Sequence, residues 1–211
     1  MSAIATHLAQ IRTKTPNATL IAVSKTRSIE EIRQALKAGQ RVFGENRVQE
    51  AQAKFPDLRK DHPDIELHLI GALQTNKAQT AVELFDVIQT VDRPDLAKAL
   101  AKAIQRTGRT PRLYVEVNIG REPQKAGILP EQLEAFLTYC RTDCGLSLTG
   151  LMCIPPHDQD PAPYFQQMRK LADEFSLPQL SMGMSGDYET AIQYGATEIR
   201  VGTAIFGERL R

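Results

Sequence analysis

The sequence predicts a closed barrel of eight parallel strands that alternate with helices, a (β/α)8 barrel of the TIM type. Short apolar runs alternate with segments of helical periodicity along the 211 residues, and eight such runs are present. Strands that each precede a helix imply right-handed parallel crossovers, and eight of them in this length fit a closed barrel better than an open sheet. The alternative is a doubly wound open sheet, but the Gly-x-Gly-x-x-Gly turn of dinucleotide-binding folds is missing.

An extra helix precedes the barrel. Ile4, Leu8 and Ile11 share one face of a predicted helix over residues 2–14, and Pro16 ends that pattern. In the first half of the barrel, each predicted strand is a short apolar run that stops before a helix signal. These strands cover residues 20–23, 41–44, 66–70 and 86–90, and the helices after them cover about residues 28–38, 46–59, 76–84 and 93–107.

Capping residues define the ends of two of these helices. Ser28 followed by Glu31 has the pattern of a capping box, and Gly39 ends the same helix. Pro94 occupies the first turn of the fourth helix, and Gly108 closes it. Both helices therefore have bounds that the sequence itself indicates.

The second half of the chain repeats the alternation. Its predicted strands cover residues 112–118, 146–153, 179–182 and 198–201, and helices lie between them at about residues 130–142, 161–176 and 187–194. Pro130 starts the first of these helices, and either Pro161 or Pro163 starts the second. No low-complexity linker interrupts the pattern, so we expect residues 1–211 to form a single domain.

Composition and charge exclude several classes of function. The chain has 26 Lys and Arg against 25 Asp and Glu, and the formal charge of +1 gives no field suited to nucleic acid or an anionic membrane. No apolar stretch approaches the length of a transmembrane helix. The three cysteines, Cys140, Cys144 and Cys153, are an odd number in a chain too long to need disulfides, which favours a reducing, cytoplasmic location. Cys140 and Cys144 lack a second pair of ligands, so we expect no metal site.

In a barrel of this kind, chemistry belongs at the C-terminal ends of the strands and in the loops that follow them. Lys25 is the most informative residue there, because a short apolar strand delivers its primary amine to the strand end. Such an amine can condense with an aldehyde to form a Schiff base, and the alternative is a solvated charge. The other polar or glycine residues at strand ends are Glu45, Asn46, His68, Gly71, Asn118, Ser185, Gly186, Gly202 and Thr203.

The loops after the seventh and eighth strands have the composition of a phosphate site. Ser185 and Gly186 offer a hydroxyl and unhindered amides before a helix, and Gly202 and Thr203 offer the same pair before a helical turn. Barrels of this type commonly bind phosphate with these two loops. In the alternative interpretation, Ser185 is only a helix cap.

Two charged or titratable residues within the strands have two possible positions. Arg200 alternates with Ile199 and Val201, so it faces either the surrounding helices or the barrel interior, where it needs a partner. His68 shares a strand face with Ile70 and is either a hydrogen-bonded core residue or a member of the pocket.

Ordered motifs along the chain resemble one family. From about residue 20 to 209 they are similar to the pyridoxal phosphate homeostasis proteins, which are relatives of the barrel domain of alanine racemase. The motifs are Ala22-Val23-Ser24-Lys25-Thr26, Phe43-Gly44-Glu45-Asn46 with Gln49-Glu50, His68-Leu69-Ile70-Gly71 with Leu73-Gln74 and Asn76-Lys77, Gly150-Leu151-Met152, Leu180-Ser181-Met182-Gly183-Met184-Ser185, and Arg200-Val201-Gly202-Thr203-Ala204-Ile205-Phe206-Gly207.

The resemblance implies a role for each matching residue. Lys25 matches the lysine that forms the internal aldimine with pyridoxal 5′-phosphate (PLP), and Arg200 matches the arginine that faces the pyridine nitrogen. A permanent positive charge there disfavours protonation of the ring, so the bound cofactor is expected to be a weaker electron sink. The remaining matches are the phosphate cradle, Ser185, Gly186, Gly202 and Thr203, and two residues beside the cofactor, Asn46 and His68.

The resemblance also implies a PLP carrier with no catalytic residue. Alanine racemases use a second, all-β domain and a tyrosine of the partner subunit as the opposing base, and we expect neither here. The expected function is PLP homeostasis with an influence on amino-acid and keto-acid balance, PLP-dependent apoenzymes as recipients, and a monomeric state. The alternative is a Schiff-base enzyme: a weak racemase, with Tyr188 as a candidate second base, or a cofactor-free, aldolase-like lyase.

Two further positions bear on this resemblance. Leu67 stands where the family often has an aromatic residue before the strand histidine, and this difference affects one expected wall of the pocket. Lys125 resembles a family lysine that could hand the aldehyde in or out, and the alternative is a solvated loop lysine.

Overall fold

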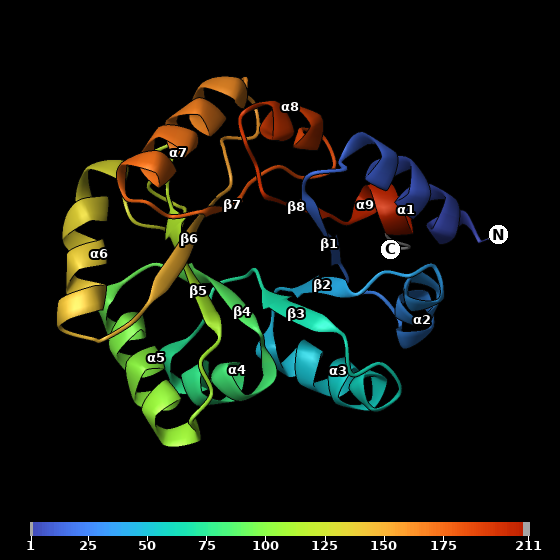
Figure 1. Ribbon diagram of the computed structural model, residues 1–211, viewed down its shortest axis with the longest axis horizontal. Coiled ribbons are helices and arrows are strands. Elements are labelled where there is room, and N and C mark those ends of the chain that lie inside the picture. Colours follow the sequence, from blue (N-terminus) through green and yellow to red (C-terminus); the bar gives the residue numbers. More distant parts are fainter. Residues whose placement is uncertain (1, 209–211) are drawn as a thin grey trace.

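The computed structural model describes residues 2–208, which form a closed barrel of eight parallel strands (Figure 1). Each strand pairs in parallel with the next, and β1 pairs with β8 to close the barrel. The strands are β1 (Thr19–Val23), β2 (Val42–Glu45), β3 (Glu66–Leu69), β4 (Val87–Val91), β5 (Arg112–Val117), β6 (Leu148–Cys153), β7 (Gln179–Ser181) and β8 (Glu198–Val201). The predicted barrel is therefore confirmed, and the open-sheet alternative is wrong.

The helices lie outside the ring of strands in Figure 1. They are α1 (Ala3–Lys14), α2 (Ile29–Lys37), α3 (Val48–Asp61), α4 (Ala78–Leu84), α5 (Pro94–Thr107), α6 (Leu133–Thr142), α7 (Ala162–Glu174), α8 (Tyr188–Gln193) and α9 (Thr203–Phe206), with 3-10 turns η1 (Thr75–Lys77) and η2 (Pro130–Gln132). Their ends differ from the predicted ones by a few residues, and the predicted extra helix α1 is present. Among residues 2–208, no helix is long and apolar enough to cross a membrane.

The local signals act as the sequence indicated. Ser28 and Glu31 form a complete capping box at the start of α2. Gly108 ends α5 in the left-handed conformation with φ of 68°, which glycine adopts without the steric cost of a Cβ atom. Outward-facing strand residues pack against the helices, as in the pair of Phe43 from β2 and Phe55 from α3, whose ring centroids are 5.7 Å apart.

Alternate residues of the strands point into the barrel. In β8, Ile199 and Val201 belong to the hydrophobic core between strands and helices. Glu198 and Arg200 lie on the opposite, interior face and are 2% and 4% exposed. The structure thus answers the question that the sequence left open for Arg200, because the guanidinium is inside the barrel and has hydrogen-bond partners there.

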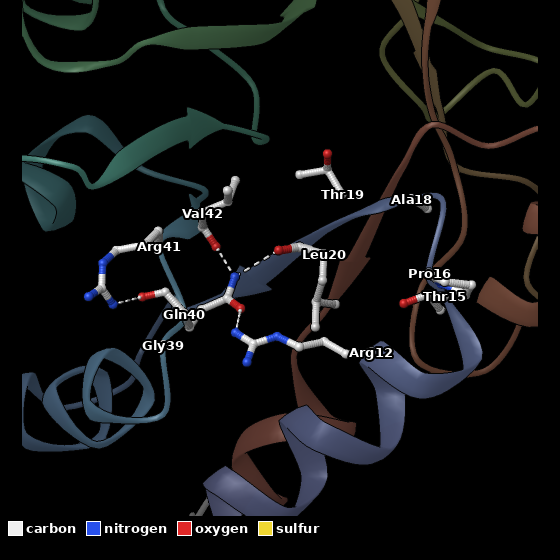
Figure 2. Close-up of a pocket in the computed structure, with 10 residues that line it drawn as sticks. All are labelled: Arg12, Thr15, Pro16, Ala18, Thr19, Leu20, Gly39, Gln40, Arg41 and Val42. Carbon is white, nitrogen blue, oxygen red and sulfur yellow. Dashed lines mark hydrogen bonds between the residues drawn. The ribbon is translucent and has the colours of Figure 1, made fainter.

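The N-terminal ends of β1 and β2 are tied to α1 around a pocket of about 310 Å³ (Figure 2). The Nε2 atom of Gln40 donates to the carbonyl oxygens of Leu20 at 2.7 Å and Val42 at 2.6 Å, while its Oε1 accepts from Arg12 at 2.9 Å. One buried amide therefore joins two strands and the first helix. This end of the barrel lies opposite Lys25, and features at the N-terminal face of such barrels serve stability.

Candidate functional site

A pocket of about 280 Å³ opens at the C-terminal ends of the strands, and we call it the Lys25 pocket. Its lining comes from the C-terminal ends of six strands and the loops after them, so only the closed barrel brings these residues together. The lining residues are Val23, Lys25, Asn46, Ile70, Ile154, Met184, Ser185, Gly186, Arg200, Gly202 and Thr203. Seven of the eight residues that the sequence suggested for the cofactor are among them, and His68 is the exception.

His68 lies deeper in the barrel than the Lys25 pocket. It pairs with Gly44 in the sheet, and the residue of its chain segment that reaches the pocket is Ile70, two positions later. The ring is fully buried, with Nε2 2.7 Å from Glu66 Oε1 and Nδ1 2.8 Å from Gln89 Nε2. Because the Gln89 amide donates to Nδ1, the proton of a neutral ring is on Nε2.

The pocket side of β3 also depends on Gly71. A Cβ atom at this position would lie 2.4 Å from the backbone oxygen of Asn46, so the two loops approach more closely than any other residue allows. Leu67 points the other way and packs in the hydrophobic core outside the strands. The departure from the family pattern at Leu67 therefore leaves the lining of the Lys25 pocket unchanged.

The loops after β7 and β8 meet at the predicted phosphate site. The backbone amide of Ala204, in the first turn of α9, donates to Ser185 Oγ at 3.4 Å. The loop of Ser185 is held in turn by Asp187, whose Oδ1 accepts from the Met184 amide at 2.6 Å. A Cβ atom at Gly186 would meet no other atom within 4 Å, so this backbone borders open space. A hydroxyl and glycine backbone thus line one corner of the pocket.

Arg200 places a fully buried guanidinium at the floor of the pocket. Its NH1 donates to Ser181 Oγ at 2.7 Å, and its NH2 donates to the carbonyl oxygen of Cys153 at 2.8 Å. Burial lowers the pKa of Arg200, and the neighbouring Cys153 and Glu116 oppose this effect. Hydrogen bonds to the barrel therefore fix both NH2 groups of the guanidinium, and this sets its orientation at the pocket.

A chain of buried hydrogen bonds continues from Arg200 through the barrel, and we call it the interior network. Ser181 Oγ donates to Gln89 Oε1 at 2.7 Å, and Gln89 Nε2 donates to Glu198 Oε2 at 2.8 Å. Glu198 Oε1 accepts a second hydrogen bond, from the Tyr114 hydroxyl at 2.6 Å. Burial raises the pKa of Tyr114, so the phenol remains a donor. The network has the members Arg200, Ser181, Gln89, Glu198, Tyr114, His68 and Glu66.

The sequence interpretation missed most of the interior network. Gln89, Ser181 and Glu198 are polar residues within short apolar strands, and that pattern indicates an interior polar position when the strand is buried on both faces. The signal was therefore present in the sequence. It does not identify the partners, because Gln89 and Glu198 are 109 positions apart.

Glu116 is a half-buried carboxyl on β5, and it gives the first testable prediction. Burial raises its pKa from 4.5 to about 7, the charge of Asp92 adds to the rise, and Arg200 opposes it. A raised carboxyl pKa favours the protonated folded state, so this group lowers the free energy of unfolding as pH rises from 4.5 to about 7. Glu116→Gln should remove this loss, which is at most about 3 kcal/mol and is smaller with solvent screening.

The measurement is urea unfolding of the wild type and of Glu116→Gln between pH 4.5 and 8. The difference in unfolding free energy should grow with pH in favour of the variant and level off above about pH 7. Carboxyls that do not interact with Glu116 affect both proteins equally and cancel in the difference, whereas the repulsion from Asp92 is part of the effect that the variant removes. A difference that does not depend on pH would contradict the raised pKa of Glu116.

Lys125 lines a second pocket beside the first. This pocket of about 670 Å³ shares Ile154, Met184 and Gly186 with the Lys25 pocket. The Nζ atom of Lys125 donates to the carbonyl oxygen of Pro155 at 3.1 Å and forms an ion pair with Glu122. Lys125 is therefore a tethered residue next to the Lys25 pocket and not one of its lining residues. Within residues 2–208, no group of three His, Cys, Asp or Glu residues is arranged to hold a metal ion.

The closed barrel and the pocket at the C-terminal ends of its strands define the chain as a (β/α)8 barrel protein with a candidate site at that face. Residues 1–210 match the family described as alanine racemase, N-terminal domain. A curated relative, the pyridoxal phosphate homeostasis protein of Vibrio cholerae, is 44% identical over 202 residues, which are 90% of this chain and 85% of the relative.

Two solved structures of PipY from Synechococcus elongatus are also similar to this chain. The structure without PLP has a TM-score of 0.91 and 44% sequence identity, and the match covers 97% of this chain and 100% of PipY. The structure with PLP bound has a TM-score of 0.89 and 43% identity, with the same coverage. The chain belongs to the pyridoxal phosphate homeostasis protein family.

Proposed function

We propose that this protein binds PLP in the Lys25 pocket and carries it covalently on Lys25. In that step the Nζ amine attacks the aldehyde carbon, a C=N bond forms and one water molecule leaves. The observation that carries the proposal is the set of groups in one small cavity: an amine, a guanidinium, and a hydroxyl beside glycine backbone. These groups suit the aldehyde, the pyridine nitrogen and the phosphate of one cofactor. Family membership and the PLP-bound structure of PipY support the same ligand.

The orientation follows from the same residues. Ser185, Gly186, Gly202 and Thr203 would hold the phosphate, and Arg200 would face the pyridine nitrogen. When bound, PLP supplies a reactive aldehyde and an electron-withdrawing ring. A guanidinium only donates hydrogen bonds and keeps its charge, so Arg200 favours the unprotonated ring nitrogen and weakens that electron withdrawal. Asn46, which lines the same pocket, would lie beside the ring, and His68 would act on Arg200 through its hydrogen bonds with Gln89 and Ser181.

The pocket supports a carrier more than a racemase. In the described part of the chain, Lys25 and Arg200 are the only ionisable side chains that line the Lys25 pocket. Racemisation needs a second base on the opposite face of the substrate, and Tyr188, the candidate, packs in the hydrophobic core. We propose that the protein is a monomer that holds PLP and passes it to PLP-dependent apoenzymes. In this way it would influence amino-acid and keto-acid balance.

The test is to load the purified protein with PLP, record the visible spectrum, reduce with borohydride and determine the intact mass. We expect a visible absorption band and a mass increase of one reduced PLP, mapped to the peptide of Lys25. Lys25→Ala should lose both, whereas Lys102→Ala, which removes an exposed lysine of α5, should keep both.

Turnover separates the carrier from the alternatives. The loaded protein should racemise or cleave amino acids no faster than free PLP does. A robust racemase rate that depends on Lys25 would overturn the carrier. A sugar fragment trapped on Lys25 without PLP would instead identify an aldolase-like lyase.

A further inference from the structure

Two buried charged residues, Lys54 and Glu45, and the partly exposed Glu50 contact the backbone on both sides of Lys25. Lys54, on the core-facing side of α3, is 9% exposed, and its Nζ contacts Glu50 Oε1 at 2.6 Å and Glu45 Oε1 at 3.2 Å. Glu45 is the last residue of β2 and is fully buried. We call Lys54, Glu45 and Glu50 the Lys54 cluster. None of the three lines the Lys25 pocket, so the proposed binding of PLP there does not explain why these charged residues are present.

The cluster holds the residues on both sides of Lys25. On the N-terminal side, Lys54 Nζ donates to the carbonyl oxygen of Ser24 at 2.9 Å, and Ser24 Oγ donates to Glu45 Oε1 at 2.7 Å. On the C-terminal side, the backbone amide of Thr26 donates to Glu50 Oε1. The backbone of Lys25 is therefore fixed at both ends by one set of charges.

The conformation of Thr26 explains why the turn needs these hydrogen bonds. Its φ angle is 63°, in the left-handed region. A β-branched residue there is a genuine outlier, because its side chain crowds the backbone. Strained residues of this kind persist only when their surroundings hold them, and they cluster at functional sites. Two contacts hold this turn: the hydrogen bond from the Thr26 amide to Glu50, and the backbone hydrogen bond from the Arg27 amide to the carbonyl oxygen of Ser24 at 3.0 Å.

Burial makes the cluster an expensive way to gain stability alone. An ion pair in the interior loses hydration that its mutual attraction only partly replaces, so apolar residues would serve a core equally well. Burial raises the pKa of Glu45, while the hydrogen bond from Ser24 and the charge of Lys54 oppose this rise. The cluster therefore serves mainly to fix the geometry of the adjacent turn.

We propose that the Lys54 cluster positions Lys25 by holding the strained turn at Thr26, so that Nζ points at the incoming aldehyde carbon. Lys54, Glu45 and Glu50 are thus positioning residues and touch no part of the cofactor. The inference rests on the proposed function, because it assumes that Lys25 condenses with PLP. Its consequence is kinetic: a misdirected amine reacts slowly even when the phosphate and ring are bound.

The test compares Lys54→Met with the wild type in two measurements on folded protein. Met keeps the unbranched, apolar part of the side chain and removes the ammonium. The rate constant for loading with PLP, followed by visible absorbance, should fall about 10-fold or more. The affinity for pyridoxine 5′-phosphate, which has an alcohol in place of the aldehyde, should change less than about 2-fold. Lys60→Met, an exposed position on the same helix, should change neither value.

A second variant keeps the test valid if Lys54→Met does not fold. Glu50→Ala removes the acceptor of the Thr26 amide but leaves the pair of Lys54 and Glu45, so loading should slow about 3-fold to 10-fold. Adding Thr26→Gly, which adopts a positive φ without strain, should restore part of that loss. Folded variants that load within 2-fold of the wild type would overturn the inference. A wild type that does not load at Lys25 would overturn the proposed function instead.

Discussion

Gln89→Leu is expected to lower the free energy of unfolding by about 4 kcal/mol, the largest stability effect that the site predicts. The side chain is fully buried at the centre of the interior network. Leu fills a similar volume but leaves Glu198, His68 and Ser181 each without one hydrogen-bond partner. A buried polar group that loses its partner costs about 1–3 kcal/mol, and more when it is charged, which exceeds what the added apolar surface returns.

Urea unfolding followed by circular dichroism measures this loss. Gln79→Leu is the matched control, because Gln79 is exposed on α4 and its side chain donates a hydrogen bond to the nearby Glu83 at 3.0 Å. That change should stay within about 0.5 kcal/mol of the wild type. An equal effect of the two substitutions would mean that the interior network contributes nothing specific to stability.

The positions of the site residues were predictable because strand ends in a parallel barrel converge. Lys25 is separated from Ser185 and Gly202 by most of the chain, yet each of the three follows a strand at its C-terminal end, and all three line one pocket. Period-two alternation also limited Arg200 to two faces of β8. These inferences need only element order and parity, and both can be read from a sequence.

Other features depend on distances that the sequence does not contain. Lys54 lies among apolar residues on one face of α3, and nothing local indicates that its ammonium reaches the carbonyl oxygen of Ser24, 30 positions earlier. The left-handed conformation of Thr26 is equally hidden, because threonine normally avoids it. For His68, the resemblance implied a position beside the cofactor, whereas the register of β3 shows that Ile70, two positions later, reaches the pocket.

The interior network and the Lys54 cluster divide the control of one pocket. Through Ser181 and Gln89, the network fixes the guanidinium of Arg200 from inside the barrel. The cluster fixes the turn of Lys25 from the side of α3. Arg200 and Lys25, which are proposed to meet the ring nitrogen and the aldehyde, are thus each positioned by a separate set of hydrogen bonds. Preorganisation of this kind reduces the reorganisation needed when a ligand binds.

Gly186→Asp is expected to weaken PLP binding by about 30-fold to 1,000-fold without unfolding the protein. The new carboxylate would stand in the open space at the proposed phosphate cradle, where a Cβ atom at Gly186 meets nothing within 4 Å. Repulsion between a carboxylate and a phosphate about 4 Å away is worth about 2–4 kcal/mol, and the value rises as the site becomes less accessible to water. That free energy corresponds to the stated loss of affinity.

Three comparisons separate charge from shape in this experiment. Gly186→Asn has nearly the same volume without the charge, so it should retain most of the affinity for PLP. Pyridoxal lacks the phosphate, so it has no charge for the new carboxylate to repel. Gly186→Asp should therefore bind pyridoxal with an affinity within about 3-fold of that of the wild type. High salt should restore part of the PLP affinity, since the site is solvent-accessible and its charges are screened. Equal losses for PLP and pyridoxal would place the phosphate elsewhere in the pocket.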